Sequence, residues 1–160
     1  MYPGEHEVLK RLLEWLRDGH RAVLVTVLSA LGASPRQPGS LAAIRDDGTV
    51  YGSVSDGRAE EDLAAEMRAG KLFALKKRVL VRAFDLPGGD LLRIAIETRL
   101  DPALLCSTIR AIEARRVVRR SVRLADGRGL LTENGDGAVF TEDEQGFSHL
   151  LGPSRGKETS

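Results

Sequence analysis

A chain of 160 residues, 42% hydrophobic and 29% charged, has the size and balance of one soluble globular domain. Its formal net charge of +1 argues against a general affinity for nucleic acid or anionic membranes. Apolar runs such as residues 22–28 are too short to cross a bilayer, and the charged N-terminus does not resemble a secretory signal.

The spacing of apolar residues predicts three helices, and runs rich in Val, Ile, Leu and Thr predict short strands between them. In chain order we expect a helix at 5–18, a buried central strand at 21–31, strands at 41–45 and 49–54 around a turn at 46–48, a helix from 56–57 to 69, strands at 78–84 and 91–98, a helix at 101–116, and hairpins over 117–141. This order predicts a single α/β or α+β domain over residues 1–151, with about three helices on a mixed sheet and C-terminal hairpins. We expect the tail at 152–160 to be disordered.

The first candidate ligand site is the loop from Gly32 to Ser40, which follows the predicted central strand. Its glycines would let backbone N–H groups turn toward a ligand, and Arg36 could grip a phosphate or carboxylate with two hydrogen bonds. The alternative is a rigid connector with an exposed arginine. The pattern alone favours the connector, because loops rich in Gly and Pro are commonly only turns.

The second candidate is the segment 52–60, where a predicted strand runs into a helix N-terminus. Free N–H groups and the helix dipole favour an anion there. Carboxylates in and around the first turn argue the other way, because they already complement the dipole: Asp56, Glu60, Glu61 and Asp62. They would repel a phosphate unless Arg58 and Arg36 offset them. An ordinary capped helix start is therefore an equal alternative to a ligand site.

Other polar residues have simpler explanations. No histidine has a partner at metal-ligand spacing, so we expect each at the surface: His6, His20 and His149. The single cysteine, Cys106, excludes an internal disulfide and suits a reducing compartment such as the cytoplasm. We expect its side chain on the buried face of a helix, as part of the core rather than as a nucleophile. The arginines between Arg110 and Arg123 form a basic cluster. A nucleic-acid-binding surface would usually also carry exposed aromatic residues, and the aromatic content here is only 4%. We therefore expect a solvent-exposed face or a contact with an acidic partner. No dinucleotide-binding, Walker or Gly-x-Ser-x-Gly motif occurs.

Three segments resemble the signatures of the XdhC/CoxI family, the xanthine dehydrogenase accessory factors, over roughly residues 7–151. The first is 32–42, which contains Ser-Pro-Arg followed by a glycine. The second is Gly-Ser-Val-Ser at 52–55, after which the family continues with Gly-Gly-Cys-Val-Glu; Arg58 stands here in the cysteine position. The third is the turn 86–90 before an apolar strand that ends in Glu97, with Gly88 in place of a cysteine.

The resemblance implies a protein that binds molybdenum cofactor, protects it during sulfuration, and delivers it to xanthine dehydrogenase or a related hydroxylase. It implies a ligand loop with an opposing wall, made of Ser34, Pro35, Arg36 and Gly39, and of Ser53, Ser55, Gly57, Arg58 and Glu60. The phosphate of molybdopterin would suit an arginine and glycine-rich backbone donors. Because both motif cysteines are replaced, we expect neither metal ligation nor sulfur transfer at these loops, and no catalytic residue.

Three hypotheses remain open at this point. The first is a non-catalytic accessory factor that binds the cofactor, the apo-hydroxylase or both. The second is a divergent interaction domain that has lost cofactor binding and pairs with a separate partner carrying a Rossmann-type domain. The third is a small hydrolase or transferase that uses Glu60 or Asp56 as a base near Arg36. Exposed sheet edges would suit a homodimer, and neither nucleic acid nor a membrane is expected as a partner.

Overall fold

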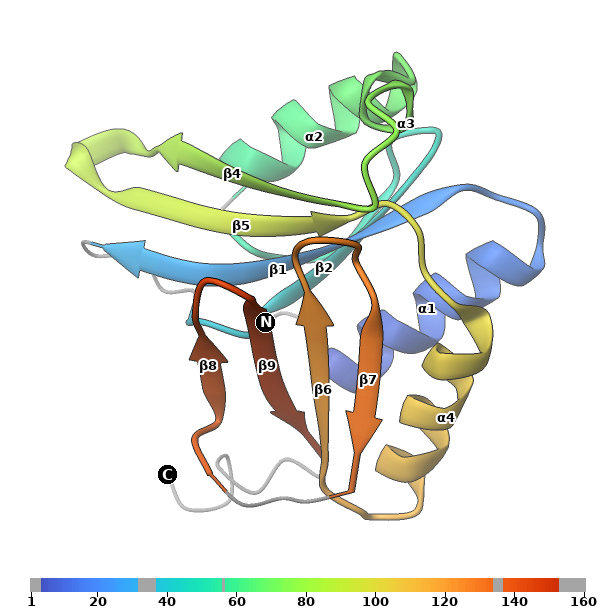
Figure 1. Ribbon diagram of the computed structural model, residues 1–160. Helices are drawn as coiled ribbons and strands as arrows, with labels where there is room; N and C mark the ends of the chain where they lie inside the picture. Colours follow the sequence, from blue (N-terminus) through green and yellow to red (C-terminus); the bar gives the residue numbers. More distant parts are fainter. Residues whose placement is uncertain (1–3, 32–36, 56, 134–136, 153–160) are drawn as a thin grey trace.

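The computed structural model describes residues 4–31, 37–55, 57–133 and 137–152, which form two sheets and the helices around them (Figure 1). The elements in chain order are α1 (Glu5–Arg17), β1 (Ala22–Leu31), β2 (Leu41–Arg45), β3 (Val50–Gly52), α2 (Arg58–Arg68), α3 (Lys71–Ala74), β4 (Val79–Asp85), η1 (Pro87–Gly89), β5 (Leu91–Glu97), α4 (Pro102–Glu113), β6 (Val118–Arg123), β7 (Gly129–Thr132), β8 (Phe140–Glu142) and β9 (Gly146–Leu151).

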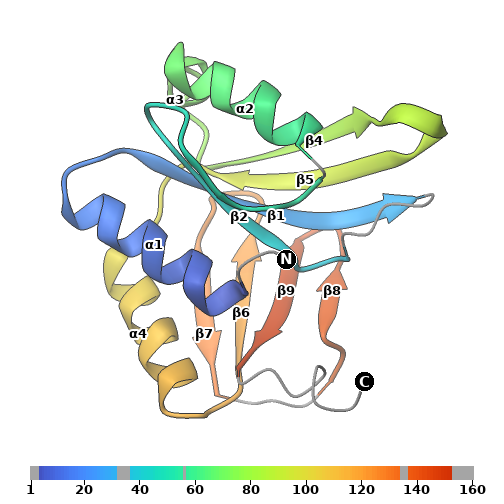
Figure 2. The same cartoon turned by 180° about the vertical axis from the view of Figure 1, so that it is seen from behind.

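The larger sheet has the strand order β3-β2-β1-β5-β4, with β1 at its centre. Side chains alternate across β1, so Val23 and Val25 join the apolar cluster under α2 and α3, whereas Leu24 joins the cluster formed with α1 and α4. Both faces of β1 are therefore buried, which explains its nearly continuous apolar sequence. Figure 2 shows α2 and α3 on one side of this sheet and α1 on the other.

The smaller sheet has the strand order β7-β6-β9-β8 and packs against the face of the larger sheet that α2 does not cover (Figure 1). Val122 of β6 and Phe147 of β9 meet Leu28 and Ala95 of the larger sheet in one apolar cluster. Helix α4 connects the two sheets, because it follows β5 of the first and precedes β6 of the second. The space between the two sheets therefore holds a separate apolar core.

The predicted α/β class is confirmed, and α1, α2 and α4 lie within a few residues of the three predicted helices. The sheet differs from the prediction, since every described strand pair is antiparallel and the strands form two sheets instead of one mixed sheet. Hairpin connections explain pairs such as β2–β3, β4–β5 and β6–β7, because a hairpin can join only antiparallel neighbours. The pairs β1–β5 and β6–β9 join strands that are further apart in the chain. The strand β9 and the short helix α3 were not predicted. Residues 153–160 of the predicted tail lie outside the described residues.

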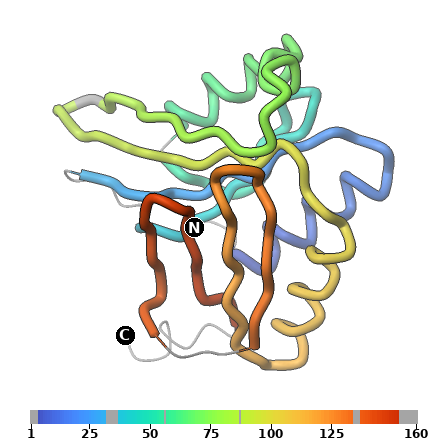
Figure 3. Tube along the Cα trace, in the orientation of Figure 1, coloured from blue at the N-terminus to red at the C-terminus, as the bar shows by residue number. Residues whose placement is uncertain are grey.

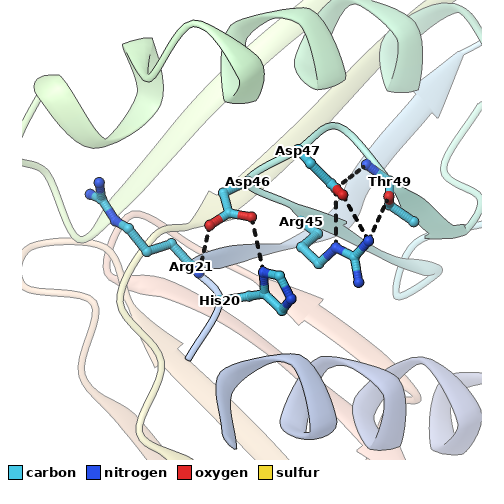
Figure 4. A network of polar contacts seen from close by, with 6 residues as sticks. All are labelled: His20, Arg21, Arg45, Asp46, Asp47 and Thr49. Carbon is cyan, nitrogen blue, oxygen red and sulfur yellow. Dashed lines mark hydrogen bonds and ion pairs between the residues drawn. The ribbon is translucent and has the colours of Figure 1, made fainter. Parts of the chain in front are cut away.

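The turn between β2 and β3 falls where it was predicted and is held by a polar network (Figure 4). The carboxylate of Asp47 accepts hydrogen bonds of 3.1 and 2.7 Å from the guanidinium of Arg45. This hydrogen-bonded pairing lowers the pKa of Asp47. Asp46 accepts a 3.2 Å hydrogen bond from the backbone N–H of Arg21, and its other oxygen lies 3.3 Å from Nδ1 of His20. The network therefore ties the turn to the start of β1.

Candidate functional site

Glu60 closes the connection between β3 and α2 with a buried carboxylate. Its Oε2 accepts hydrogen bonds from the backbone N–H groups of Val54 and Ser55, at 2.8 and 3.1 Å, and lies 3.1 Å from the hydroxyl of Ser53. Its Oε1 accepts a hydrogen bond from the hydroxyl of Ser55, and that hydroxyl in turn accepts one of 3.0 Å from the N–H of Ala59. Glu60 is the third residue of α2, so it reaches back over the helix start as a capping glutamate does.

These N–H and hydroxyl groups are the donors that the sequence predicted for an anionic ligand at residues 52–60. The Glu60 carboxylate takes the place of that anion, and the donors of Ser53 and Ser55 are bonded to it or to the adjacent backbone. The described residues of this segment therefore do not fit a phosphate between the strand and the helix. Gly57 caps α2 with a φ of 108° and open space beside it, and Arg58 is exposed in the first turn. Asp56 lies outside the described residues.

The first predicted loop is described only from residue 37 onward, so Ser34, Pro35 and Arg36 lie outside the described residues. Gly39 is buried, and its N–H donates a 2.8 Å hydrogen bond to the carbonyl of Val27. A Cβ placed on it would lie 3.9 Å from the side chain of His149. The end of this loop therefore packs on the smaller sheet.

The two predicted loops meet at the same end of the larger sheet. Ala42, just after the first loop, pairs in register with Gly52, which opens the second. Gly52 has a φ of 95°, and a Cβ on it would come within 2.6 Å of the carbonyl oxygen of Leu41. The structure thus brings the described ends of both motifs side by side. Cofactor binding by their residues remains a prediction.

A buried ion pair between the two sheets was missed by the sequence prediction. The guanidinium of Arg120 donates hydrogen bonds of 2.9 and 2.8 Å to the two carboxylate oxygens of Glu97. Its Nε–H donates a third bond, of 3.0 Å, to Nε2 of His149. All three residues are at most 4% exposed. Among the described residues, the Nδ1 of His149 has no hydrogen-bond partner, and neither does the buried hydroxyl of Thr26.

The expected surface position of His149 is wrong, because β9 alternates with Phe147, His149 and Leu151 on its inner face. Arg120 likewise lies between Val118 and Val122 on the inner face of β6, so it does not belong to a solvated basic face. In β6 the inward position of Arg120 could have been predicted, because Val118 and Val122 lie two residues before and after it and so share its face of the strand. For β9 the strand itself had to be recognised first.

The remaining polar candidates are structural. The arginines at the ends of β6 are paired, Arg116 with Glu133 and Arg123 with Asp126. Cys106 is partly buried against the α1–α4 cluster, as expected, and its Sγ lies 3.7 Å from a guanidinium nitrogen of Arg17. Within the described ranges, no three or more His, Cys, Asp or Glu side chains come together as a metal site would require. None of the described helices has the length and apolarity needed to span a membrane.

Stability is expected to fall as the pH drops below about 6.5, the ordinary pKa of histidine, because of His149. Burial, and then the neighbouring charges of Arg120 and Arg119, lower the pKa of His149 well below that value. Between the two pKa values the unfolded chain binds a proton that the folded chain does not, which favours unfolding by up to about 1.4 kcal/mol per pH unit. Urea unfolding at pH 7.5, 6.5 and 5.5 would measure the slope.

The variant His149→Gln should have a flatter slope over this pH range, whatever its stability at pH 7.5. The control Arg110→Gln changes an exposed arginine of α4 and removes no histidine, so it should keep the wild-type slope. Equal slopes in wild type and His149→Gln would contradict the assignment.

Similarities to known proteins include a protein family and a solved structure. The model of the XdhC and CoxI family matches residues 15–82. A crystal structure described as that of a xanthine dehydrogenase from Bacillus halodurans superposes with a TM-score of 0.71 and 17% sequence identity. The alignment covers 94% of this chain and 53% of that one, so this chain spans about half of its length. Among curated proteins, none matches the sequence.

The family resemblance predicted from the motifs is confirmed by the match over residues 15–82, which contains the first two motifs. The third motif, at 86–97, lies beyond that match. The Bacillus halodurans structure shares the fold, and at 17% identity it carries no further conclusion.

Proposed function

Because residues 15–82 match the XdhC and CoxI family, we propose that this chain is a non-catalytic accessory protein for a molybdenum hydroxylase. It would act on the apo-enzyme, on the molybdenum cofactor or on both. The observation that carries the proposal is that the end of the first matched motif and the start of the second lie side by side in the larger sheet, where Ala42 pairs with Gly52. We infer that the loops on either side of this pairing provide the recognition surface that an accessory protein requires.

The fixed geometry of the second motif supports recognition in preference to chemistry. Glu60 receives its hydrogen bonds within residues 53–55, and this internal pairing holds the strand-to-helix connection in one conformation. A preorganised connection loses little conformational entropy when a partner binds. A base needs access to substrate, but the Glu60 carboxylate is only 6% exposed and already bonded, which argues against the hydrolase hypothesis.

We assign cofactor contact to Ser34, Pro35 and Arg36 of the first motif and to the exposed Arg58 of the second motif. The bound cofactor would present the phosphate of its pterin, which an arginine can hold by two hydrogen bonds. A reducing cytoplasm, expected from the single cysteine, would suit this role.

The second candidate function is an interaction domain that no longer binds cofactor. The occupied donors around Glu60 favour it, as does the arginine in the motif's cysteine position. In that case the partner would be the hydroxylase itself, a separate chain carrying a Rossmann-type domain, or a second copy of this chain.

Two measurements on the purified chain separate these functions. One is an absorbance titration with free molybdenum cofactor, and the other is a pull-down with the apo-hydroxylase. The accessory role with cofactor contact predicts that Arg36→Ala weakens cofactor binding at least about tenfold, as expected for loss of a charge-assisted pair. The control Arg110→Ala changes an exposed arginine of α4 and should bind like wild type.

Hydroxylase capture that is equal in wild type and Arg36→Ala, without cofactor binding by either, would instead support the interaction domain. Failure to bind both the cofactor and the hydroxylase would refute the proposed accessory function.

A further inference from the structure

A cavity of about 660 Å³ opens between the two sheets, on the side away from the two motifs. Its walls are the start of β4, the link from β5 to α4, the first turn of α4, and the turn from β6 to β7. Figure 3 shows these segments converging, with the β6–β7 turn reaching the larger sheet. The approach is close, because a Cβ on Gly127 would lie 2.7 Å from Cβ of Arg78. The volume lies in the usual range for small-ligand pockets.

Three arginines from separate elements surround the cavity. Arg78 precedes β4, Arg99 lies between β5 and α4, and Arg128 precedes β7. All three are exposed, and none has a hydrogen bond or ion pair from its guanidinium to a residue that the structure describes. Unpaired guanidinium groups converging on one cavity create a positive potential, which favours an anion.

The carboxylates that line the cavity are already bonded. Asp101 caps α4, where it accepts a 2.9 Å hydrogen bond from the N–H of Ala103. Asp126 accepts a 3.0 Å hydrogen bond from Nε of Arg123 and a second bond from the same guanidinium. Arg123 balances the charge of Asp126, whereas the neutral N–H bonded to Asp101 leaves that charge in place. Asp101 can therefore offset at most one of the three arginines, and the rim keeps an excess of positive charge.

The inner end of the cavity is the buried pair of Glu97 and Arg120. Glu97 receives two of the Arg120 hydrogen bonds, so this pair adds no net charge. The Nη1 and Nη2 of Arg120 each carry a second hydrogen, for which the described part of the chain provides no acceptor. The net positive charge of the cavity therefore lies at its rim, with the three exposed arginines.

We propose that this cavity binds a small molecule through a phosphate group, held by Arg78, Arg99 and Arg128 at the rim. A phosphate matches the site better than a carboxylate, because its additional oxygens and second charge can engage more than one guanidinium. This site goes beyond the proposed accessory function, since the three arginines that would hold the phosphate lie outside all three family motifs. Free phosphate and a phosphate monoester share this chemistry.

The test is a calorimetric titration of the full chain with inorganic phosphate and with pyrophosphate, at constant ionic strength. Wild type should bind both, and the double variant Arg99→Gln/Arg128→Gln should bind at least about tenfold more weakly. The matched control Arg110→Gln removes an exposed arginine of α4 that does not line the cavity, and it should bind like wild type. Both changed residues are exposed, so unchanged thermal unfolding without phosphate would show that the variant folds.

The position of binding is tested by NMR, because Gly127 and Gly129 line the cavity and have distinct amide signals. Their shifts should move on phosphate titration in wild type and in Arg36→Ala, which separates this site from the cofactor loop. An equal effect of sodium acetate, equal affinity in the double variant, or shifts confined to other residues would overturn the proposal. Tighter binding of pyrophosphate than of phosphate would point to a phosphorylated metabolite, and the reverse to the free ion; either supports the site.

Discussion

Replacing Arg120 by methionine is expected to lower the free energy of unfolding by about 3–5 kcal/mol, the largest effect of any single substitution considered for this chain. The substitution leaves the carboxylate of Glu97 buried between the sheets without a counter-charge. It also removes the only hydrogen bond of the His149 ring that the described residues provide. Chemical denaturation at pH 7.5, followed by circular dichroism, would measure the loss.

The double variant Glu97→Leu/Arg120→Met should recover most of that stability. A buried ion pair pays a desolvation cost similar to its own attraction, so apolar residues of similar volume replace it with little net change. Arg116→Met serves as the control, because its ion pair with Glu133 is exposed and should contribute little. A loss in the double variant as large as in Arg120→Met would mean that the ion pair itself, and not the unpaired charge, sets the stability.

The elements that could be predicted from the sequence are those with a local signal. The helix ending near Gly19 and the helix beginning at Asp101-Pro102 have their boundaries coded by adjacent residues, and both appear within a few positions. The strand β9 has no such signal, since Phe147, Ser148 and His149 do not alternate clearly between apolar and polar residues. Its inner face is defined only by the sheet opposite.

In the candidate site, too, the contacts between residues close in sequence could be predicted and the distant ones could not. The capped helix start at Glu60 was one of two open alternatives, and it depends on contacts within seven residues of the chain. The pair of Glu97 and Arg120 spans 23 residues, and Arg120 to His149 spans 29. No periodicity in one strand can indicate which partner the other sheet will supply. Partners that distant follow from the packing of the two sheets on each other.

Glu60→Ala is expected to destabilise the fold by about 2–4 kcal/mol, because it removes the acceptor of several buried donors at once. The N–H groups of Val54 and Ser55 would lose their partner in an interior that water does not reach. Glu60→Gln should cost less, since its amide keeps one carbonyl oxygen for those N–H groups. Some cost should remain, because its NH₂ group would then face the hydroxyl donor of Ser55. Thermal and urea unfolding of both variants would give the two values.

The neighbouring Glu61 provides the control, because it is exposed in the same first turn of α2 and has the same charge near the helix dipole. Glu61→Ala should change stability only slightly, and the difference between the two alanine variants isolates the internal hydrogen bonds from the dipole effect. If Glu60→Ala were as stable as Glu61→Ala, the carboxylate would not be needed to hold the strand-to-helix connection. The donors around it would then be free to bind a ligand, and the second motif would regain its place in the cofactor site.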